Sequence, residues 1–382
     1  MRKLINTLLL GLLCLNLYAQ DEVTSIAEIT AETEILDLSG QNLTTFPVDI
    51  CKWKQLRILR LDNNLLTSLP AEIGQLVNLK ELLVRNNKLT YLPDEIGQLT
   101  KLEYFNVDYN PLKSLPKAIG KLTQLRHLEL NSQLNSIPEE IGNMIGLETL
   151  SIVGDPIETL PKSIGNLSNL HNLEIRGTKI STIPDEIGKL LNLTYLSLTG
   201  NKIIKMPISI GNLSKLEYLQ LYENQLKTIP AEIGGLKNLQ KIALDHNQIT
   251  TLPDEIFGLP KLITLSLYKN QLTNISPKIK QLVQLKALYL AFNNIKIIPK
   301  EVWLLKNLES LDIRDFKLNS LPSEIGNLIN LKTLGIDNNN LSHFPNEMGN
   351  LKNLESVFYT GNPLPKSELV KLKKWCPKCL VE

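Results

Sequence analysis

Residues 56–78 read LRILRLDNNLLTSLPAEIGQLVN, and residues 79–101 read LKELLVRNNKLTYLPDEIGQLTK. Aligned, these two stretches define the 23-residue frame LxxLxLxxNxLxxLPxxIGxLxx. Self-similarity at a fixed period of roughly 20–50 residues is the signature of a repeat architecture. The frame extends in both directions, and its fifteen copies begin at Thr33, Leu56, Leu79, Leu102, Leu125, Leu147, Leu170, Leu193, Leu216, Leu239, Leu262, Leu285, Leu308, Leu331 and Leu354.

The first half of each repeat alternates apolar and polar residues, which is the period of a half-buried strand. Leu59 and Leu61 are expected to point inward while their neighbours point outward. One such strand is too short to be stable alone, so successive repeats must stack their strands into a parallel sheet and share one core. The second half, such as residues 70–76, is short and contains Pro and Gly, which predicts a short helical or 3₁₀ turn.

These turns are wider than the strand spacing of about 4.8 Å, so the stack must bend with its strands on the inside. The predicted fold class is α/β: a solenoid with a curved parallel sheet on the concave face and short helical or 3₁₀ turns on the convex face. The LPxEIGxLxNL phrasing at 69–79 and 321–331, and at 92–102 with Lys101 in place of the asparagine, resembles the leucine-rich-repeat family and is similar to its Ras-group-related type, found in bacterial, plant and animal proteins. The resemblance covers residues 33–382 and implies the same solenoid.

Asparagine at repeat position nine lies where the chain leaves the strand. Its side-chain amide can pair with backbone groups that would otherwise be buried without partners. The pattern fails at Gln41, Asp155, Thr178 and Phe316, and the repeat at Leu125 is one residue short, which predicts a local irregularity of the arc over 125–192. The predicted structural ladder consists of Asn64, Asn87, Asn110, Asn201, Asn224, Asn247, Asn270, Asn293, Asn339 and Asn362.

The two ends of the chain differ from the repeats. Residues 1–19 have a basic start and a mostly apolar run, which predicts a secretory signal peptide and export to the periplasm, the envelope or the cell exterior. The alternatives are an uncleaved membrane anchor, for which the run is short, and lipid attachment at Cys14, where Leu13 stands in place of a small residue. No later stretch is apolar enough to cross a bilayer. The remaining predicted units are an N-terminal cap over 20–32, a solenoid over 33–364 and a C-terminal helical cap over 365–382.

Three cysteines remain after the predicted cleavage: Cys51, Cys376 and Cys379. They are too sparse for a disulfide-built scaffold. Cys376 and Cys379 form a CxxC motif, which is compatible with a cap disulfide, buried thiols, a redox pair or half a zinc site. No second CxxC or nearby histidine supplies further zinc ligands, so we expect a disulfide or buried thiols, and no metal.

The composition and the motifs argue against catalysis and against nucleic acid. Lysine and arginine (41) nearly balance aspartate and glutamate (39), so no charge excess favours nucleic acid as a partner. The four histidines fall in four repeats at four different positions, and the sequence has no HExxH, GxSxG or phosphate-binding glycine loop. Acidic pairs such as Asp94 and Glu95 are typical of a solvated convex edge. We predict a protein that is not an enzyme and has no cofactor.

A partner is expected on the concave face, because strand positions three, five and seven point out of the sheet and position eight follows them. Seven of the nine tyrosines after the signal peptide occupy these positions. Exposed aromatic side chains are enriched among interface hot spots, although they also suit strands by cross-strand packing. Propensity alone would not favour the exposed positions. The predicted partner-binding residues are Tyr195, Tyr218, Tyr222, Asp245, His246, Tyr268, Tyr289 and Phe292.

These features predict a non-enzymatic module that recognises a protein partner through its concave face. One alternative is an intracellular scaffold like the Ras-group-related proteins, which requires that the leader is not cleaved. Another is an extracellular glycan binder, in which the tyrosines would stack on sugars. An enzyme would need a catalytic domain, for which residues 33–382 leave no room. Analogy of fold does not identify the ligand, because such solenoids differ in their surface residues.

Overall fold

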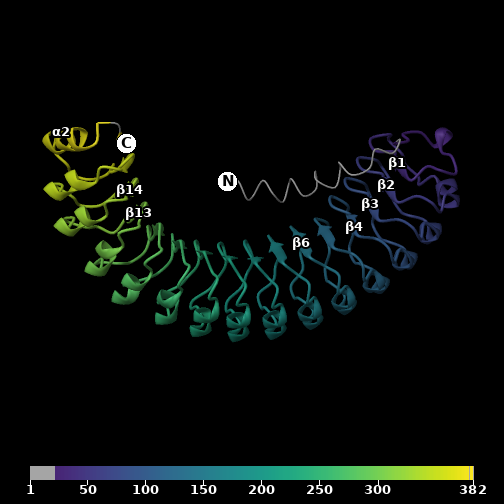
Figure 1. Cartoon of the computed structure of the whole chain (residues 1–382), viewed down its shortest axis with the longest axis horizontal. Helices are drawn as coiled ribbons and strands as arrows, with labels where there is room; N and C mark the ends of the chain where they lie inside the picture. Colours follow the sequence, from purple (N-terminus) through teal and green to yellow (C-terminus); the bar gives the residue numbers. More distant parts are fainter. Residues whose placement is uncertain (1–21, 378, 382) are drawn as a thin grey trace.

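The computed structural model of the chain is a curved stack of repeats, and it describes residues 22–377 and 379–381. Strands line the inner edge of the arc, and short turns stand along its outer edge (Figure 1). The predicted fold class, a solenoid with a concave parallel sheet and convex 3₁₀ turns, is confirmed. The predicted signal peptide, residues 1–19, lies outside the described residues.

The concave face is one parallel sheet in which each strand pairs with the next along the chain. The register advances by one repeat at each step, so that Leu59 pairs with Leu82 and Leu82 pairs with Phe105. The strands are β1 (Ile35–Asp37), β2 (Ile58–Arg60), β3 (Glu81–Leu83), β4 (Tyr104–Asn106), β5 (His127–Leu130), β6 (Thr149–Val153), β7 (Asn172–Arg176), β8 (Tyr195–Ser197), β9 (Tyr218–Gln220), β10 (Lys241–Ala243), β11 (Thr264–Ser266), β12 (Ala287–Tyr289), β13 (Ser310–Asp312), β14 (Thr333–Gly335), β15 (Ser356–Phe358) and β16 (Leu380–Val381).

The convex face is a row of 3₁₀ turns, most of which begin directly after a proline. Proline fixes its own φ near the helical value, which suits the residue before a turn. Each turn is only three to five residues long, which is typical of 3₁₀ structure. The turns are η2 (Ile26–Glu28), η3 (Val48–Lys52), η4 (Ala71–Gln75), η5 (Asp94–Gln98), η6 (Lys117–Lys121), η7 (Glu139–Asn143), η8 (Lys162–Asn166), η9 (Asp185–Lys189), η10 (Ile208–Asn212), η11 (Ala231–Gly235), η12 (Asp254–Gly258), η13 (Pro277–Gln281), η14 (Lys300–Leu304), η15 (Ser323–Asn327) and η16 (Asn346–Asn350).

The glycine of these turns lets neighbouring turns approach closely. A Cβ atom at Gly97 would lie 2.5 Å from the carbonyl oxygen of Ala118 in the next turn, which is closer than real Cβ contacts. Three successive repeats have Phe257, Lys280 and Trp303 at this position, and the two aromatic side chains are buried. The leucines and isoleucines of the frame fill one continuous core between the turns and the sheet.

The asparagines at position nine connect successive repeats. Asn87 Nδ2 donates to the carbonyl oxygens of Leu61 (2.9 Å) and Val84 (3.0 Å), and its Oδ1 accepts from the amide of Leu66 (3.0 Å). The same two donations, to carbonyl oxygens 26 and 3 residues earlier, are made by Asn64, Asn110, Asn201, Asn224, Asn247, Asn270, Asn293, Asn339 and Asn362.

A second set of asparagines, which the sequence analysis did not identify, joins the repeats just after the convex turns. Asn78 Nδ2 donates to the carbonyl oxygen of Lys54 (3.0 Å), and its Oδ1 accepts from Lys101 Nζ (2.7 Å). Equivalent donations to the carbonyl 24 residues earlier are made by Asn169, Asn192, Asn238, Asn307, Asn330 and Asn353. The NL of the repeat consensus is therefore a structural contact and not only a spacer.

The region 125–192 departs from the regular ladder. Asp155 and Thr178 stand at position nine, and β6 and β7 are five residues long where most strands have three. Their pairing runs from Thr149 with Asn172 to Val153 with Arg176. Longer strand pairing thus supplies backbone hydrogen bonds where the asparagines are missing. The change of curvature predicted here stays a prediction.

At the two ends the core is covered by different elements. Val23 bridges to Leu36, and Ile29 is buried whereas Ile26 is 37% exposed. Helix α2 (Lys366–Trp375) buries Leu372, and its Trp375 packs on Gly349.

The structure joins Cys376 and Cys379 in a disulfide, which is one of the alternatives that the motif left open, and Cys51 is a buried free thiol. Burial raises the pKa of the Cys51 thiol to about 11, so that it is un-ionised at neutral pH. None of the helices in the described residues has the length and apolar character to span a membrane.

Candidate recognition surface

The eight predicted partner-binding residues all lie on or beside the middle of the concave sheet. Tyr195, Tyr218 and Tyr289 are in β8, β9 and β12. The others lie in the short segments that directly follow β9 to β12. Phe292 is 40% exposed and the remaining seven are half-buried, so each of the eight presents part of its side chain to solvent. The eight residues are Tyr195, Tyr218, Tyr222, Asp245, His246, Tyr268, Tyr289 and Phe292.

Three of these residues form a continuous aromatic row, which we define as His246, Tyr268 and Phe292. The ring centroids of His246 and Tyr268 are 5.3 Å apart, and those of Tyr268 and Phe292 are 5.0 Å apart in an edge-to-face arrangement. Such pairs stabilise each other by about 0.5–1.5 kcal/mol beyond their area burial. The row is therefore an ordered apolar ridge along the rim of the sheet.

The backbone under this row is held in an unfavourable conformation. His246 has φ 52° and Phe292 has φ 57°, in the left-handed region that costs an ordinary L-residue about 1–2 kcal/mol. Both stand at repeat position eight. Other repeats have residues there that tolerate this conformation, namely Gly40, Asn63, Asn86, Gly154, Gly177, Gly200, Asn338 and Gly361.

Glu223, Lys269 and Asp315 also have positive φ at position eight, so this conformation belongs to the repeat position. His246 and Phe292 are rings that occupy it in place of glycine or asparagine. Tyr109, with φ 54° and half of its side chain exposed, is a further residue of this kind. The recurrence of asparagine and glycine at position eight is the sequence signal of this backbone conformation.

Asp245 has a supporting place under the aromatic row. Its Oδ1 accepts from the amide of Tyr268 (2.9 Å) and from the hydroxyl of Ser266. Burial raises the pKa of Asp245, which these two hydrogen bonds partly offset. Asp62 and Asp337 hold the amide of the next repeat in the same way. Asp245 thus orients Tyr268, and its direct contact with a partner stays a prediction.

The remaining predicted tyrosines flank the row. The rings of Tyr195 and Tyr218 are 6.3 Å apart, and Lys241 Nζ lies 5.7 Å from the centroid of the Tyr218 ring. Tyr195 donates its hydroxyl to Gln220 Oε1 at 3.0 Å. Tyr222 and Tyr289 make no ring contact with other aromatic side chains within the described part of the chain. The structure therefore brings five of the eight predicted residues into two ring clusters and leaves these two tyrosines apart.

The N-terminal half of the concave face is polar, and its groups bind one another. Tyr104 donates to Glu129 at 3.4 Å, and Asn106 Nδ2 donates to the same carboxylate at 2.9 Å. Burial raises the pKa of Tyr104 to about 12 and, with the charge of Glu129, that of Asp108 to about 6. Tyr104, Asn106 and Glu129 thus satisfy one another, whereas Oδ1 of Asp108 is buried without a hydrogen-bond partner among the described residues.

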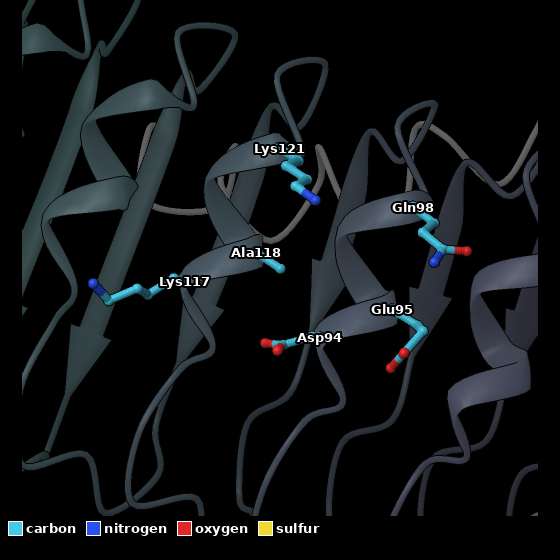
Figure 2. Close-up of a pocket in the computed structure, with 6 residues that line it drawn as sticks. All are labelled: Asp94, Glu95, Gln98, Lys117, Ala118 and Lys121. Atoms are coloured by element: carbon cyan, nitrogen blue, oxygen red, sulfur yellow. The ribbon is translucent and has the colours of Figure 1, made fainter.

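A hollow of about 380 Å³ lies on the convex side, between η5 and η6. Figure 2 shows the side chains that line it. Its carboxylates come from η5 and its ammonium groups from η6, and none of its lining side chains is buried. It is an open gap between two neighbouring turns without an apolar wall. Its lining residues are Asp94, Glu95, Gln98, Lys117, Ala118 and Lys121.

The described residues contain no group of three or more His, Cys, Asp or Glu side chains that could hold a metal ion. The histidines of the concave face serve ring contacts. His127 lies 5.9 Å from Tyr104, and burial lowers its pKa, so that it is neutral at pH 7. The chemistry that this surface offers is therefore contact by aromatic and hydrogen-bonding groups.

Sequence comparison gives matches along the whole stack. The leucine-rich repeat region family matches residues 33–132, 113–199 and 270–373, and two further leucine-rich-repeat families match residues 207–249, 237–295 and 192–213. The sequence has no match among curated proteins.

Solved structures extend the comparison. A leucine-rich-repeat protein of Leptospira interrogans is 39% identical, with a TM-score of 0.86 over 95% of this chain and 100% of that one. The plant peptide hormone receptor RGFR1, solved in complex with RGF2, is 31% identical, with a TM-score of 0.64 over 86% of this chain and 63% of the receptor. An internalin of Listeria monocytogenes is 21% identical, with a TM-score of 0.59 over 90% of this chain and 85% of that one. This likeness shows the fold alone.

Proposed function

Because the chain belongs to the leucine-rich-repeat family, we propose that it is a binding module that holds a protein or peptide against its concave face. The family is commonly a protein-interaction module, and similar structures include a receptor bound to a peptide hormone. The observation that carries the proposal is the aromatic row, because its rings are partly exposed and two of them stand on strained backbone.

Aromatic side chains in this setting suit the centre of an interface. They bring a large apolar area with few rotatable bonds. Truncating a hot-spot residue of this kind to alanine costs about 2 kcal/mol or more of binding free energy. Polar side chains lie beside these rings: Asp245 accepts from the amide of Tyr268 in the row, and Lys241 and Gln220 contact the neighbouring tyrosine pair. A partner would thus meet an apolar ridge with a polar rim, as protein interfaces commonly have.

The test compares capture of partners from extracellular and envelope fractions by the wild-type chain and by the double variant Tyr268→Ala/Phe292→Ala. We expect the double variant to weaken binding of the captured protein by about 30-fold or more. Tyr91→Ala is the matched control, because Tyr91 is 55% exposed outside the concave positions. Circular dichroism verifies that all variants are folded. Equal affinity of the double variant and the wild type would reject this surface.

The glycan-binding alternative predicts a different outcome of the same comparison. In that case a glycan array would give hits that the double variant loses, while protein capture would be unaffected.

We also propose that the chain is exported, on the basis of residues 1–19. Amino-terminal sequencing of the mature protein should begin near Ala19 or Gln20. An intact Met1 in the cytoplasmic fraction would favour the intracellular scaffold instead.

A further inference from the structure

A second hollow, of about 280 Å³, lies on the concave face towards its C-terminal end, over β12 to β15. Four residues share strand position five here and stand side by side in the sheet: Tyr289, Asp312, Gly335 and Phe358. Gly335 has no side chain, so the row of side chains is interrupted between two rings. Tyr289 and Phe358 stand at the two ends of the gap, three strand spacings or about 14 Å apart.

The floor of this hollow is a fixed ion pair. Arg314 Nε and Nη2 donate to the two carboxylate oxygens of Asp312 at 2.7 and 2.6 Å. A Cβ atom at Gly335 would lie 2.9 Å from Oδ1 of Asp312 and 3.4 Å from Cγ and Cδ of Arg314, so both members of the ion pair lie against this glycine. The missing side chain at position 335 thus both opens the hollow and lets the guanidinium reach Asp312.

The charges of the lining favour a neutral occupant. Arg314 is one-third exposed, whereas Asp312 is nearly buried and already neutralised by Arg314. A lysine from a partner would meet the guanidinium, and a carboxylate would have to compete with Asp312. The face of an aromatic ring carries partial negative charge and is attracted to a guanidinium. The guanidinium is also planar and stacks readily on rings.

Two hydroxyl groups add a polar requirement. Ser310 and Thr333 line the hollow with their hydroxyl-bearing side chains. They can pair with the indole N–H of a tryptophan or the hydroxyl of a tyrosine. A phenylalanine or leucine offers no such group.

We propose that this hollow is a specificity pocket for a tryptophan or tyrosine side chain of the partner, seated on the Arg314–Asp312 pair between Tyr289 and Phe358. The inference rests on the proposed function, and it names the side chain that the C-terminal part of the concave face selects. Tyr289 lies both in this pocket and among the predicted partner-binding residues, so the pocket continues the proposed surface.

The test uses N-acetyltryptophanamide as the probe and the full chain as the protein, with saturation-transfer NMR and titration. We expect saturable binding of this probe, and binding at least about tenfold weaker for N-acetylleucinamide and N-acetyllysinamide. Gly335→Val fills the hollow, and Phe358→Ala removes one wall without changing the backbone. Each variant should weaken probe binding by about tenfold. Tyr91→Ala, at an exposed tyrosine outside the concave positions, is the control and should leave probe binding unchanged within twofold.

Absence of saturable probe binding, or equal binding by the wild type and both pocket variants, overturns the inference. The two proposals fail separately. A chain that captures a partner but does not bind the probe overturns the pocket alone, whereas probe binding by a chain whose aromatic row is dispensable contradicts the proposed function alone.

Discussion

Asp155 occupies the position at which ten other repeats have asparagine. Its Oδ1 accepts from the amides of Ser132 (3.0 Å) and Leu134 (2.9 Å), as an asparagine oxygen does in the regular ladder. Its Oδ2 is buried and has no hydrogen-bond partner among the described residues. Burial raises the pKa of this carboxyl to about 6. A charged oxygen therefore stands where an amide group would donate.

Asp155→Asn should stabilise the chain at pH 7, because it removes a charge whose Oδ2 is buried without a hydrogen-bond partner among the described residues. We expect the free energy of unfolding to rise by about 1–2 kcal/mol in urea titrations. The folded pKa of Asp155 lies above the ordinary 3.8, so its contribution is fully present below that value and is lost as the pH rises through about 6. The advantage of the variant should accordingly shrink at pH 5.

Asn87→Asp is the converse control, because Asn87 has the complete set of ladder hydrogen bonds. It should destabilise the chain at pH 7 and recover part of the loss at pH 5. An Asp155→Asn variant that is less stable than the wild type at both pH values would show that the carboxyl is not the defect described here.

The sequence predicted the roles of residues that recur from repeat to repeat, but not the features that depend on backbone conformation. The position-nine asparagines follow from a fixed place in the frame, and Asn87 donates as expected. The strained backbone of Phe292 could not be predicted from its residue type, because an aromatic ring has no preference for positive φ. Asn78 was missed for a different reason, since its place in the consensus was visible but its acceptor in the previous repeat was not.

The C-terminal helix α2 is attached to the stack by one buried acid. Glu368, 6% exposed, accepts from the amide of Phe344 (2.8 Å) and from Lys371 Nζ (2.6 Å). Burial alone would raise the pKa of Glu368, but these hydrogen bonds outweigh it and hold the pKa below its ordinary value of 4.5. The contribution of Glu368 is therefore present above pH 4.5 and is lost as the pH falls through the folded pKa.

Glu368→Ala should loosen the cap, because it leaves the buried amide of Phe344 without an acceptor at a cost of about 1–3 kcal/mol. Hydrogen exchange at neutral pH should show lost protection at Phe344 and in α2. Lys374→Ala, at an exposed position of the same helix, is the matched control and should leave both protected. Unchanged exchange in the Glu368 variant would mean that apolar packing alone holds the cap.

The strands and turns could be predicted where the residues of a single repeat determine them. The alternation in residues 56–61 gives the strand, and Pro70 with Gly74 gives the turn. The greater length of β6 and β7 was not predictable, because it depends on what both neighbours lack at position nine. The disulfide between Cys376 and Cys379 was one of several interpretations of the CxxC motif, because the sequence does not give the distance between the two sulfur atoms.

Each strand of the described sheet pairs only with its neighbours in sequence, so no strand pairing joins distant repeats across the arc. The period and the unequal widths of strand and turn were enough to predict this shape. The ring contacts on which the proposed binding surface rests were harder to predict, because they depend on the side chains of neighbouring strands together. The pocket at Gly335 was not predicted, since it arises from an absent side chain.

Coupling only between neighbours predicts that damage at the C-terminal end stays local. The disulfide closes a short loop that holds β16 against β15, and loss of such a closure costs about 2 kcal/mol. In Cys376→Ser/Cys379→Ser we expect amide exchange in β15 to accelerate by about 25-fold, with β8 to β12 unchanged. Partner capture through the aromatic row should persist, because that row lies several repeats away. Adding a reductant to the wild type should reproduce the same pattern, and a loss of protection along the entire sheet would contradict a stack stabilised by nearest neighbours.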